Sequence, residues 1–111
     1  MLRAVIHVDE TGKWPVAAAN VANLLRDAGE NGVQAAVLAN GEAVEALRPG
    51  GDLAPALEQL AEKGVEVLAC RNSLRSLNMA EEDLPGFVRV VPAGITELVR
   101  RQQEGWSYVR P

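Results

Sequence analysis

The chain has 111 residues, 48% of them apolar, and its eleven basic and fifteen acidic residues give a net charge of −4. This length suits one core, so we expect residues 1–111 to form a single domain. A mildly acidic chain without a Lys/Arg cluster is a poor match for nucleic-acid phosphates or anionic membrane surfaces, and we expect neither as a partner.

The single cysteine, Cys70, cannot form an internal disulfide, which favours a reducing compartment. No apolar run approaches the ~20 residues that cross a bilayer. The first six residues lack the apolar stretch and cleavage site of a signal peptide. We therefore expect a cytoplasmic protein.

The first half of the chain alternates between strand-like and helix-like segments. Residues 3–8 predict a strand, and Pro15 follows Trp14 in the first turn of a helix that ends at Gly29. The nearly continuous apolar run 33–39 is typical of a strand covered on both faces. A short helix is expected over 42–47.

The second half continues the alternation. Asp52 is a good N-cap for a helix with an apolar stripe at Leu53, Leu57, Leu60 and Ala61. The remaining expected elements are a strand over 65–69, a short helix capped by Asn72 or Ser73 and running to Met79, a strand over 87–91, a helix carrying Ile95, Leu98, Val99 and Gln102, and a tail, 106–111, that is a candidate short strand.

Such alternation predicts an α/β fold in which parallel strands are joined by right-handed crossovers. We expect three layers, with a mostly parallel sheet of four to five strands flanked by helices in a flavodoxin-like winding. In such a sheet, ligands bind at the edge where the strands have their carboxyl ends. The residues that follow the expected strands are Asp9 and Glu10, Asn40 and Gly41, Cys70 to Ser73, and Pro92 to Gly94.

Cys70 is the main candidate for chemistry at this edge. It lies at a strand-to-helix turn, where free backbone N–H groups favour an anion, and Arg71 and Arg75 add positive charge nearby. Both effects lower a thiol pKa and increase the nucleophilic thiolate. A buried cysteine that only fills space is an equally weighted interpretation.

His7 is the only histidine and lies within the first strand. A histidine without Cys, Asp or Glu at metal-ligand spacing is more often structural, so no metal site is expected. An alternative is that His7 helps to activate Cys70, if their strands are neighbours. The chain also lacks a phosphate-binding glycine loop, a Gly-x-Ser-x-Gly elbow and a histidine pair, which argues against a serine or metal hydrolase.

Several stretches together resemble the DsrE/DsrF-like (YchN-like) family, in particular its small stand-alone members. The cysteine turn Val67–Leu74 with Asn78 is similar to the cysteine turn of that family. Further similar stretches are Val5–Glu10 with Trp14, Asn20 and Asn23, the turn Asn40–Gly41, and the ending Val90–Val99 with Gln102–Trp106 and Tyr108.

This resemblance implies a YchN-like parallel sheet that assembles as trimers or hexamers. Better-known members are subunits of sulfur-relay complexes, in which a cysteine carries a persulfide between donor and acceptor proteins. Cys70 stands where the family places that cysteine. The relay subunits, however, carry more basic residues and longer loops around theirs, so this compact chain is closer to members without an assigned activity.

The first functional hypothesis is therefore a persulfide carrier that needs no cofactor, and whether it is an enzyme stays open. Cys70 would carry the sulfur, backbone N–H groups and Arg71 would stabilise the anion, and Asn72 and Asn40 would position the approaching group. Ser73, Gly41, Gly94 and His7 complete the candidate site.

Two alternatives belong to other classes. In one, the same edge binds a small molecule or anion in an oligomeric module, and Cys70 is structural. In the other, the chain is an assembly subunit that uses the aromatic tail 106–109 as a contact, because aromatic residues are enriched at interfaces.

Overall fold

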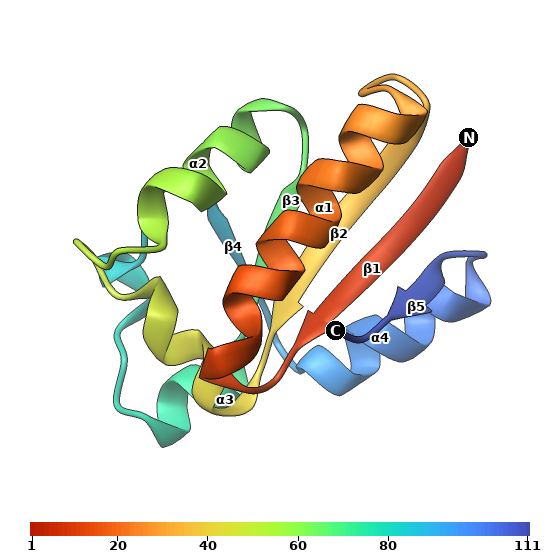
Figure 1. The fold of residues 1–111 in the computed structure, drawn as a ribbon. Coiled ribbons are helices and arrows are strands. Elements are labelled where there is room, and N and C mark those ends of the chain that lie inside the picture. Colours follow the sequence, from red (N-terminus) through yellow and green to blue (C-terminus); the bar gives the residue numbers. More distant parts are fainter.

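The computed structural model describes residues 1–111 as a five-stranded, entirely parallel sheet flanked by helices (Figure 1), which confirms the α/β fold class. The strands are β1 (Leu2–Val8), β2 (Val33–Ala39), β3 (Glu66–Cys70), β4 (Val88–Val91) and β5 (Ser107–Val109). The helices are α1 (Trp14–Ala28), α2 (Ala54–Glu62), α3 (Arg71–Ser76) and α4 (Gly94–Gln103), with 3-10 helices η1 (Thr11–Lys13), η2 (Gly41–Leu47) and η3 (Glu81–Asp83). None of the helices combines the length and apolar character needed to cross a bilayer.

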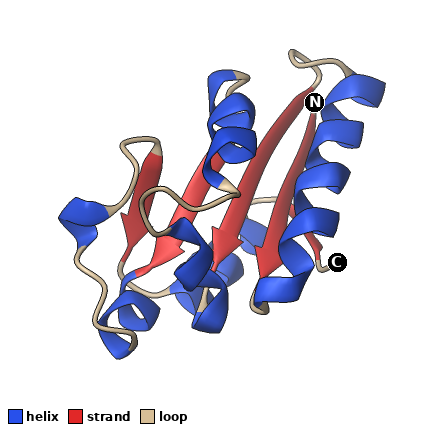
Figure 2. Cartoon of the chain, turned by 60° about the vertical axis from the view of Figure 1, so that its left-hand side comes forward, coloured by secondary structure: helices blue, strands red, loops and turns tan.

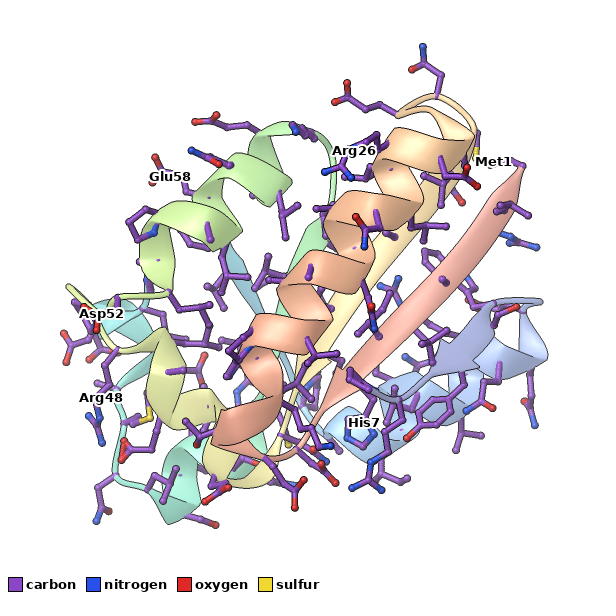
Figure 3. The ribbon with its side chains drawn as sticks, viewed as in Figure 1. Met1, His7, Arg26, Arg48, Asp52 and Glu58 are labelled. Carbon is purple, nitrogen blue, oxygen red and sulfur yellow. The ribbon has the colours of Figure 1, made fainter.

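The strands lie in the order β4-β3-β2-β1-β5 and point the same way (Figure 2). The first three crossovers each step one strand outward, whereas the last crossover returns to place β5 beside β1. Because such crossovers are right-handed, α1 and α2 cover one face and α4 covers the other. Met1 and His7 lie towards opposite ends of β1 (Figure 3), and His7 is at the end where the parallel strands finish.

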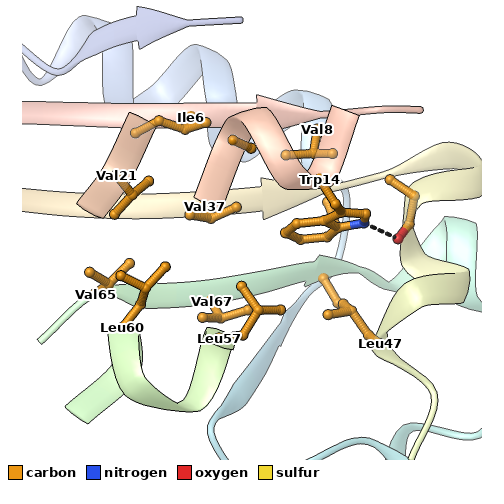
Figure 4. Close-up of a cluster of buried hydrophobic side chains, with 14 of the residues drawn as sticks. Ile6, Val8, Trp14, Val21, Val37, Leu47, Leu57, Leu60, Val65 and Val67 are labelled. Carbon is orange, nitrogen blue, oxygen red and sulfur yellow. Dashed lines mark hydrogen bonds between the residues drawn. The ribbon is translucent and has the colours of Figure 1, made fainter. Parts of the chain in front are cut away.

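The larger core lies between the sheet and α1, η2 and α2 (Figure 4). Alternate strand residues such as Ile6, Val37 and Val67 point into it, as the two-residue period of a strand requires. Trp14, at the start of α1, is 2% exposed, and its indole Nε1–H donates to the carbonyl of Ala43 at 2.9 Å. This bond joins the beginning of α1 to η2 beside the carboxyl ends of β1 and β2.

The opposite face of the sheet is packed mainly by α4. Its apolar cluster is small and consists of Val5, Ala36, Leu38, Leu68, Val91 and Leu98, with Trp106 packed against it. The buried side of α4 also carries Glu97 and Arg101, which are 9% and 6% exposed. The Arg101 guanidinium donates to Glu97 at 2.7 Å and to Glu66 on β3 at 2.8 Å, and it lies 4.5 Å from the centroid of the Trp106 ring.

Two helix starts differ from those expected. The N-cap of α2 is Leu53 and not Asp52, and the N-cap of α3 is Cys70 and not Asn72 or Ser73. The chain passes from β3 into α3 without an intervening loop, so the last strand residue itself takes the cap position. The cysteine is therefore fixed by a strand on one side and a helix on the other.

We predict that Arg101→Met lowers the free energy of unfolding at pH 7 by about 3 kcal/mol. It removes the buried guanidinium from Glu66 and Glu97 and leaves these carboxylates only the more exposed Arg89 and Arg100. The hydrogen bond from Arg101 lowers the pKa of Glu66, so this stabilisation is present above the ordinary carboxylate pKa and is lost as the pH falls through the lowered one. Urea denaturation at pH 7 and pH 4 would show a smaller difference at pH 4.

Arg100→Met is the matched control, since the Arg100 side chain is 57% exposed and pairs only with Glu97. It should cost less than about 1 kcal/mol. Equal losses for the two variants would contradict a special role for the buried pair.

Candidate functional site

The carboxyl ends of β3 and β4 form the centre of the candidate site. The crossover after β3 leaves over one face of the sheet, whereas α4 leaves β4 over the other, so these neighbouring strands mark the point where a parallel sheet binds its ligands. Cys70 ends β3, and Gly94 begins α4. The backbone N–H of Gly94 donates to the Cys70 Sγ at a distance of 3.3 Å.

Gly94 makes this approach because it has no side chain. A Cβ at this position would lie 3.0 Å from Leu38 Cδ2, 3.2 Å from Cys70 Cβ and 3.4 Å from Asn40 Cβ. These distances are at or below ordinary carbon–carbon contact, so a larger residue would push the start of α4 away from β2 and β3. The glycine therefore sets the distance between the amide and the sulfur.

Ser73 is the second group that contacts the sulfur. The backbone N–H of Gly41 donates to Ser73 Oγ at 2.8 Å, and the Ser73 hydroxyl donates to the Cys70 thiolate. Gly41 has φ +58°, which a glycine adopts without strain. The turn after β2 thus orients the hydroxyl that faces the end of β3.

Several opposing effects act on the pKa of the Cys70 thiol. Burial raises the pKa, since the residue is only 5% exposed, but hydrogen bonds from the Ser73 hydroxyl and from the backbone N–H groups of Gly94, Ser73 and Asn72 outweigh burial. The pKa of Cys70 therefore lies below its ordinary value. Such donors favour the thiolate, which is the nucleophilic form of the group.

The Arg71 side chain is directed to another partner. Its guanidinium forms a two-pronged ion pair with Glu81, with distances of 2.6 Å and 3.2 Å. The lowered pKa of Cys70 is thus due to hydrogen bonds, with no contribution from the charge of Arg71. Asn72 is exposed and contributes its backbone N–H.

His7 is linked to the site through Asn40. Strand β2 lies between β1 and β3, so the alternative in which His7 and Cys70 lie on neighbouring strands is wrong. His7 Nε2 lies 2.7 Å from Asn40 Oδ1, and His7 Nδ1 lies 2.7 Å from the Tyr108 hydroxyl. Sequence reasoning missed this pairing of Tyr108 with His7, because 101 positions separate them and only the placement of β5 beside β1 joins them.

The surface hollows lie elsewhere on the molecule. Cys70 lines none of the four, which are formed by α4, by the region of Trp14 and Leu53, by the groove between α1 and β5, and by the end of α1. No three His, Cys, Asp or Glu side chains gather in a group that could hold a metal ion. The chemistry of the edge therefore rests on one thiol and the donors around it.

The fold and the site together define a small α/β protein with a parallel sheet of five strands and a single cysteine at the carboxyl end of β3. Residues 5–111 match the DsrE/DsrF-like family, and the chain belongs to that family. The crystal structure of the YchN protein from E. coli has the same fold, with 18% identity, a TM-score of 0.78 and full coverage of both chains.

The chain is also similar to MTH1491, a protein of unknown function from Methanobacterium thermoautotrophicum. The two share 35% identity, with a TM-score of 0.93 and 100% of each chain covered. No curated protein matches this sequence. The family and the YchN-like fold expected from the cysteine turn and the chain ending are therefore confirmed.

We predict that Ser73→Ala raises the pKa of the Cys70 thiol, because one hydrogen bond to the charged form is lost. The pH dependence of Cys70 alkylation by iodoacetamide, followed by intact mass, would show a midpoint shifted upward. Ser76→Ala is the matched control, since the Ser76 hydroxyl donates to the Asn72 carbonyl and not to the sulfur. Identical midpoints for Ser73→Ala and the native chain would show that the hydroxyl does not stabilise the thiolate.

Proposed function

We propose that this chain is a sulfur-relay protein in which Cys70 carries sulfane sulfur as a persulfide. The observation that carries the proposal is the set of donors around the Cys70 sulfur, which lowers the pKa of its thiol although the residue is buried. Membership of the DsrE/DsrF-like family supports the same chemistry. A thiolate kept free of disulfides requires a reducing compartment, and we therefore place the protein in the cytoplasm.

Both transfer steps balance without an external oxidant. In loading, the Cys70 thiolate attacks the outer sulfur of a donor persulfide; the new S–S bond forms as the donor S–S bond breaks, and the donor departs as a thiolate. In unloading, an acceptor thiolate attacks the outer sulfur on Cys70, and Cys70 becomes the leaving thiolate. A low pKa assists this second step because a more acidic thiol leaves faster.

Access to the sulfur is part of this proposal. A residue that is 5% exposed reacts only when the segments around it move slightly. Those segments are the turn after β2, the start of α3 and the start of α4. Reaction of the folded chain therefore tests the exposure and the pKa of Cys70 together.

We predict that the folded protein, mixed with glutathione persulfide, gains the mass of one sulfur atom and that Cys70→Ser gains none. Intact mass spectrometry before and after reduction measures this gain, and transfer to a small thiol acceptor should restore the original mass. If Cys70 neither takes up sulfur nor reacts with iodoacetamide until the chain is unfolded, then it is a packing residue. An anion-binding module would then be the better interpretation.

We further propose that the chain acts as a homo-oligomer, a trimer or a hexamer. The outward side of α4 supports assembly, because Ile95 is 65% exposed and Val99 is 47% exposed. They line a shallow hollow of about 400 Å³ with Thr96, Arg100 and Gln103. Ile95 and Val99 lie one turn apart and form a small exposed apolar patch, which is the contact between subunits that we propose.

We predict that light scattering gives a mass well above the 11.9 kDa of one chain and that Ile95→Glu lowers it. A buried carboxylate would be costly in such a contact. Val16→Glu is the control, because the Val16 side chain is exposed on α1, and it should leave the mass unchanged. A native mass of one chain would refute the proposed assembly.

A further inference from the structure

Tyr108, His7 and Asn40 form a line of side chains that ends next to Cys70. They come from β5, from β1 and from the turn that follows β2, and both ring nitrogens of His7 are within hydrogen-bond distance, 2.7 Å, of a partner. The rings of His7 and Tyr108 are 5.6 Å apart between centroids. The ion pair between Arg110 and Asp9, at 3.1 Å, ties the same tail to the end of β1.

This arrangement fixes the direction of the Asn40 amide. The Asn40 Oδ1 atom can only accept a hydrogen bond, so His7 Nε2 carries a proton. His7 Nδ1 then accepts from the Tyr108 hydroxyl when the ring is neutral and donates to the hydroxyl oxygen when the ring is charged. In either state the amide oxygen is held towards β1.

The amide nitrogen of Asn40 is consequently turned away from β1. Asn40 Nδ2 carries two donors and has no hydrogen-bond partner within the chain, in contrast to its oxygen. The nitrogen is open to solvent, since no buried side-chain nitrogen or oxygen is left without a partner. On the side away from β1 lies β3, where Ala39 pairs with Ala69 and the next residues along are Asn40 and Cys70. Leu38 and Leu68 face α4, and the backbone of Asn40 is extended, so Asn40 and Cys70 face α4 as well.

Gly94 confirms that the two side chains are neighbours. Its missing Cβ would lie 3.2 Å from Cys70 Cβ and 3.4 Å from Asn40 Cβ, so both side chains flank the same backbone position. The Gly94 N–H is already used by the Cys70 sulfur. Asn40 thus carries an unpaired amide nitrogen on a side chain that neighbours Cys70, and its amide oxygen is held by residues of β1 and β5.

We propose that Asn40 is the residue that holds the outer sulfur of the Cys70 persulfide, and that His7 and Tyr108 are positioning residues for its amide. The inference rests on the proposed persulfide chemistry. The departing donor thiolate takes the charge of the attacking thiolate with it, and the persulfide left on Cys70 then loses its proton to solvent. The negative charge of this persulfide anion resides on a new sulfur about 2 Å beyond Sγ, and the donors on Sγ do not reach it. An amide N–H at that point lowers the energy of the persulfide anion and so favours the loaded state of Cys70.

The experiment separates the thiol from the persulfide. Asn40→Leu has a similar volume and no donor; it should lower the equilibrium constant for loading by glutathione persulfide about tenfold, as expected for the loss of one hydrogen bond to the persulfide anion. It should also raise the pH midpoint for alkylation of the persulfide, while that of the thiol stays unchanged because Asn40 is not among the groups that contact Sγ. Asn31→Leu, in the exposed turn before β2, is the matched control.

Tyr108→Phe removes the hydroxyl that positions His7 and leaves the neighbourhood of Cys70 unchanged. It should weaken loading by glutathione persulfide about threefold and raise the pH midpoint for alkylation of the persulfide. Unfolding midpoints show whether either variant has simply lost stability. If both variants show the native loading equilibrium and the native pH midpoint for alkylation of the persulfide, the inference is overturned while the proposed function is left intact. If the native chain takes up no sulfur, the proposed function itself fails, and the inference fails with it.

Discussion

The close packing of Gly94 against the ends of β2 and β3 is the constraint on which the site depends. Since a Cβ there would lie only 3.0 Å from Leu38 and 3.2 Å from Cys70, the start of α4 can reach the sheet only without a side chain. That approach delivers the backbone N–H to the cysteine sulfur. It also keeps the residue at 5% exposure, so the same contact that favours the thiolate limits access to it.

A buried thiol with a lowered pKa requires donors at short range. In a site of this kind, dipoles that are already oriented stabilise an anion without a second charge that must itself be desolvated. The Ser73 hydroxyl and three backbone N–H groups have that role here, whereas Arg71 is bound to Glu81. The Cys70 thiolate is therefore favoured by the fold and not by a surface charge.

Much of the fold could be predicted from the sequence because apolar periodicity and glycine ends are local signals. The strand at 33–39 and the helix that ends at Gly29 were predicted at their observed bounds. The buried side of α4 could not be predicted from local signals. Ile95 and Val99 point outward, whereas Glu97 and Arg101 are buried. An apolar pattern assigns charged residues to the surface, and it does not contain the contact of Arg101 with Glu66, which lies 35 positions away in the sequence.

Some residues of the candidate site could be predicted from local signals, and others depend on tertiary contacts. The expected parallel sheet brings to one edge the residues that lie at or just after strand ends, which are Cys70, Ser73, Gly41 and Gly94. The direction of Arg71 and the pairing of His7 with Tyr108 depend on side-chain rotamers and on the strand order, which no local pattern contains. The order places β2 between β1 and β3, so His7 is one strand too far to contact the sulfur and lies instead beside Asn40.

Helix α4 connects stability to the site because it holds β3 at both of its ends. Its first residue, Gly94, donates to Cys70 at the end of the strand, and Arg101 binds Glu66 at the beginning. Gly94, Glu97, Leu98 and Arg101 repeat at helical spacing and form one buried side of the helix. The ion pair thus fixes the position of α4 along the strand, and with it the place of the amide that faces the sulfur.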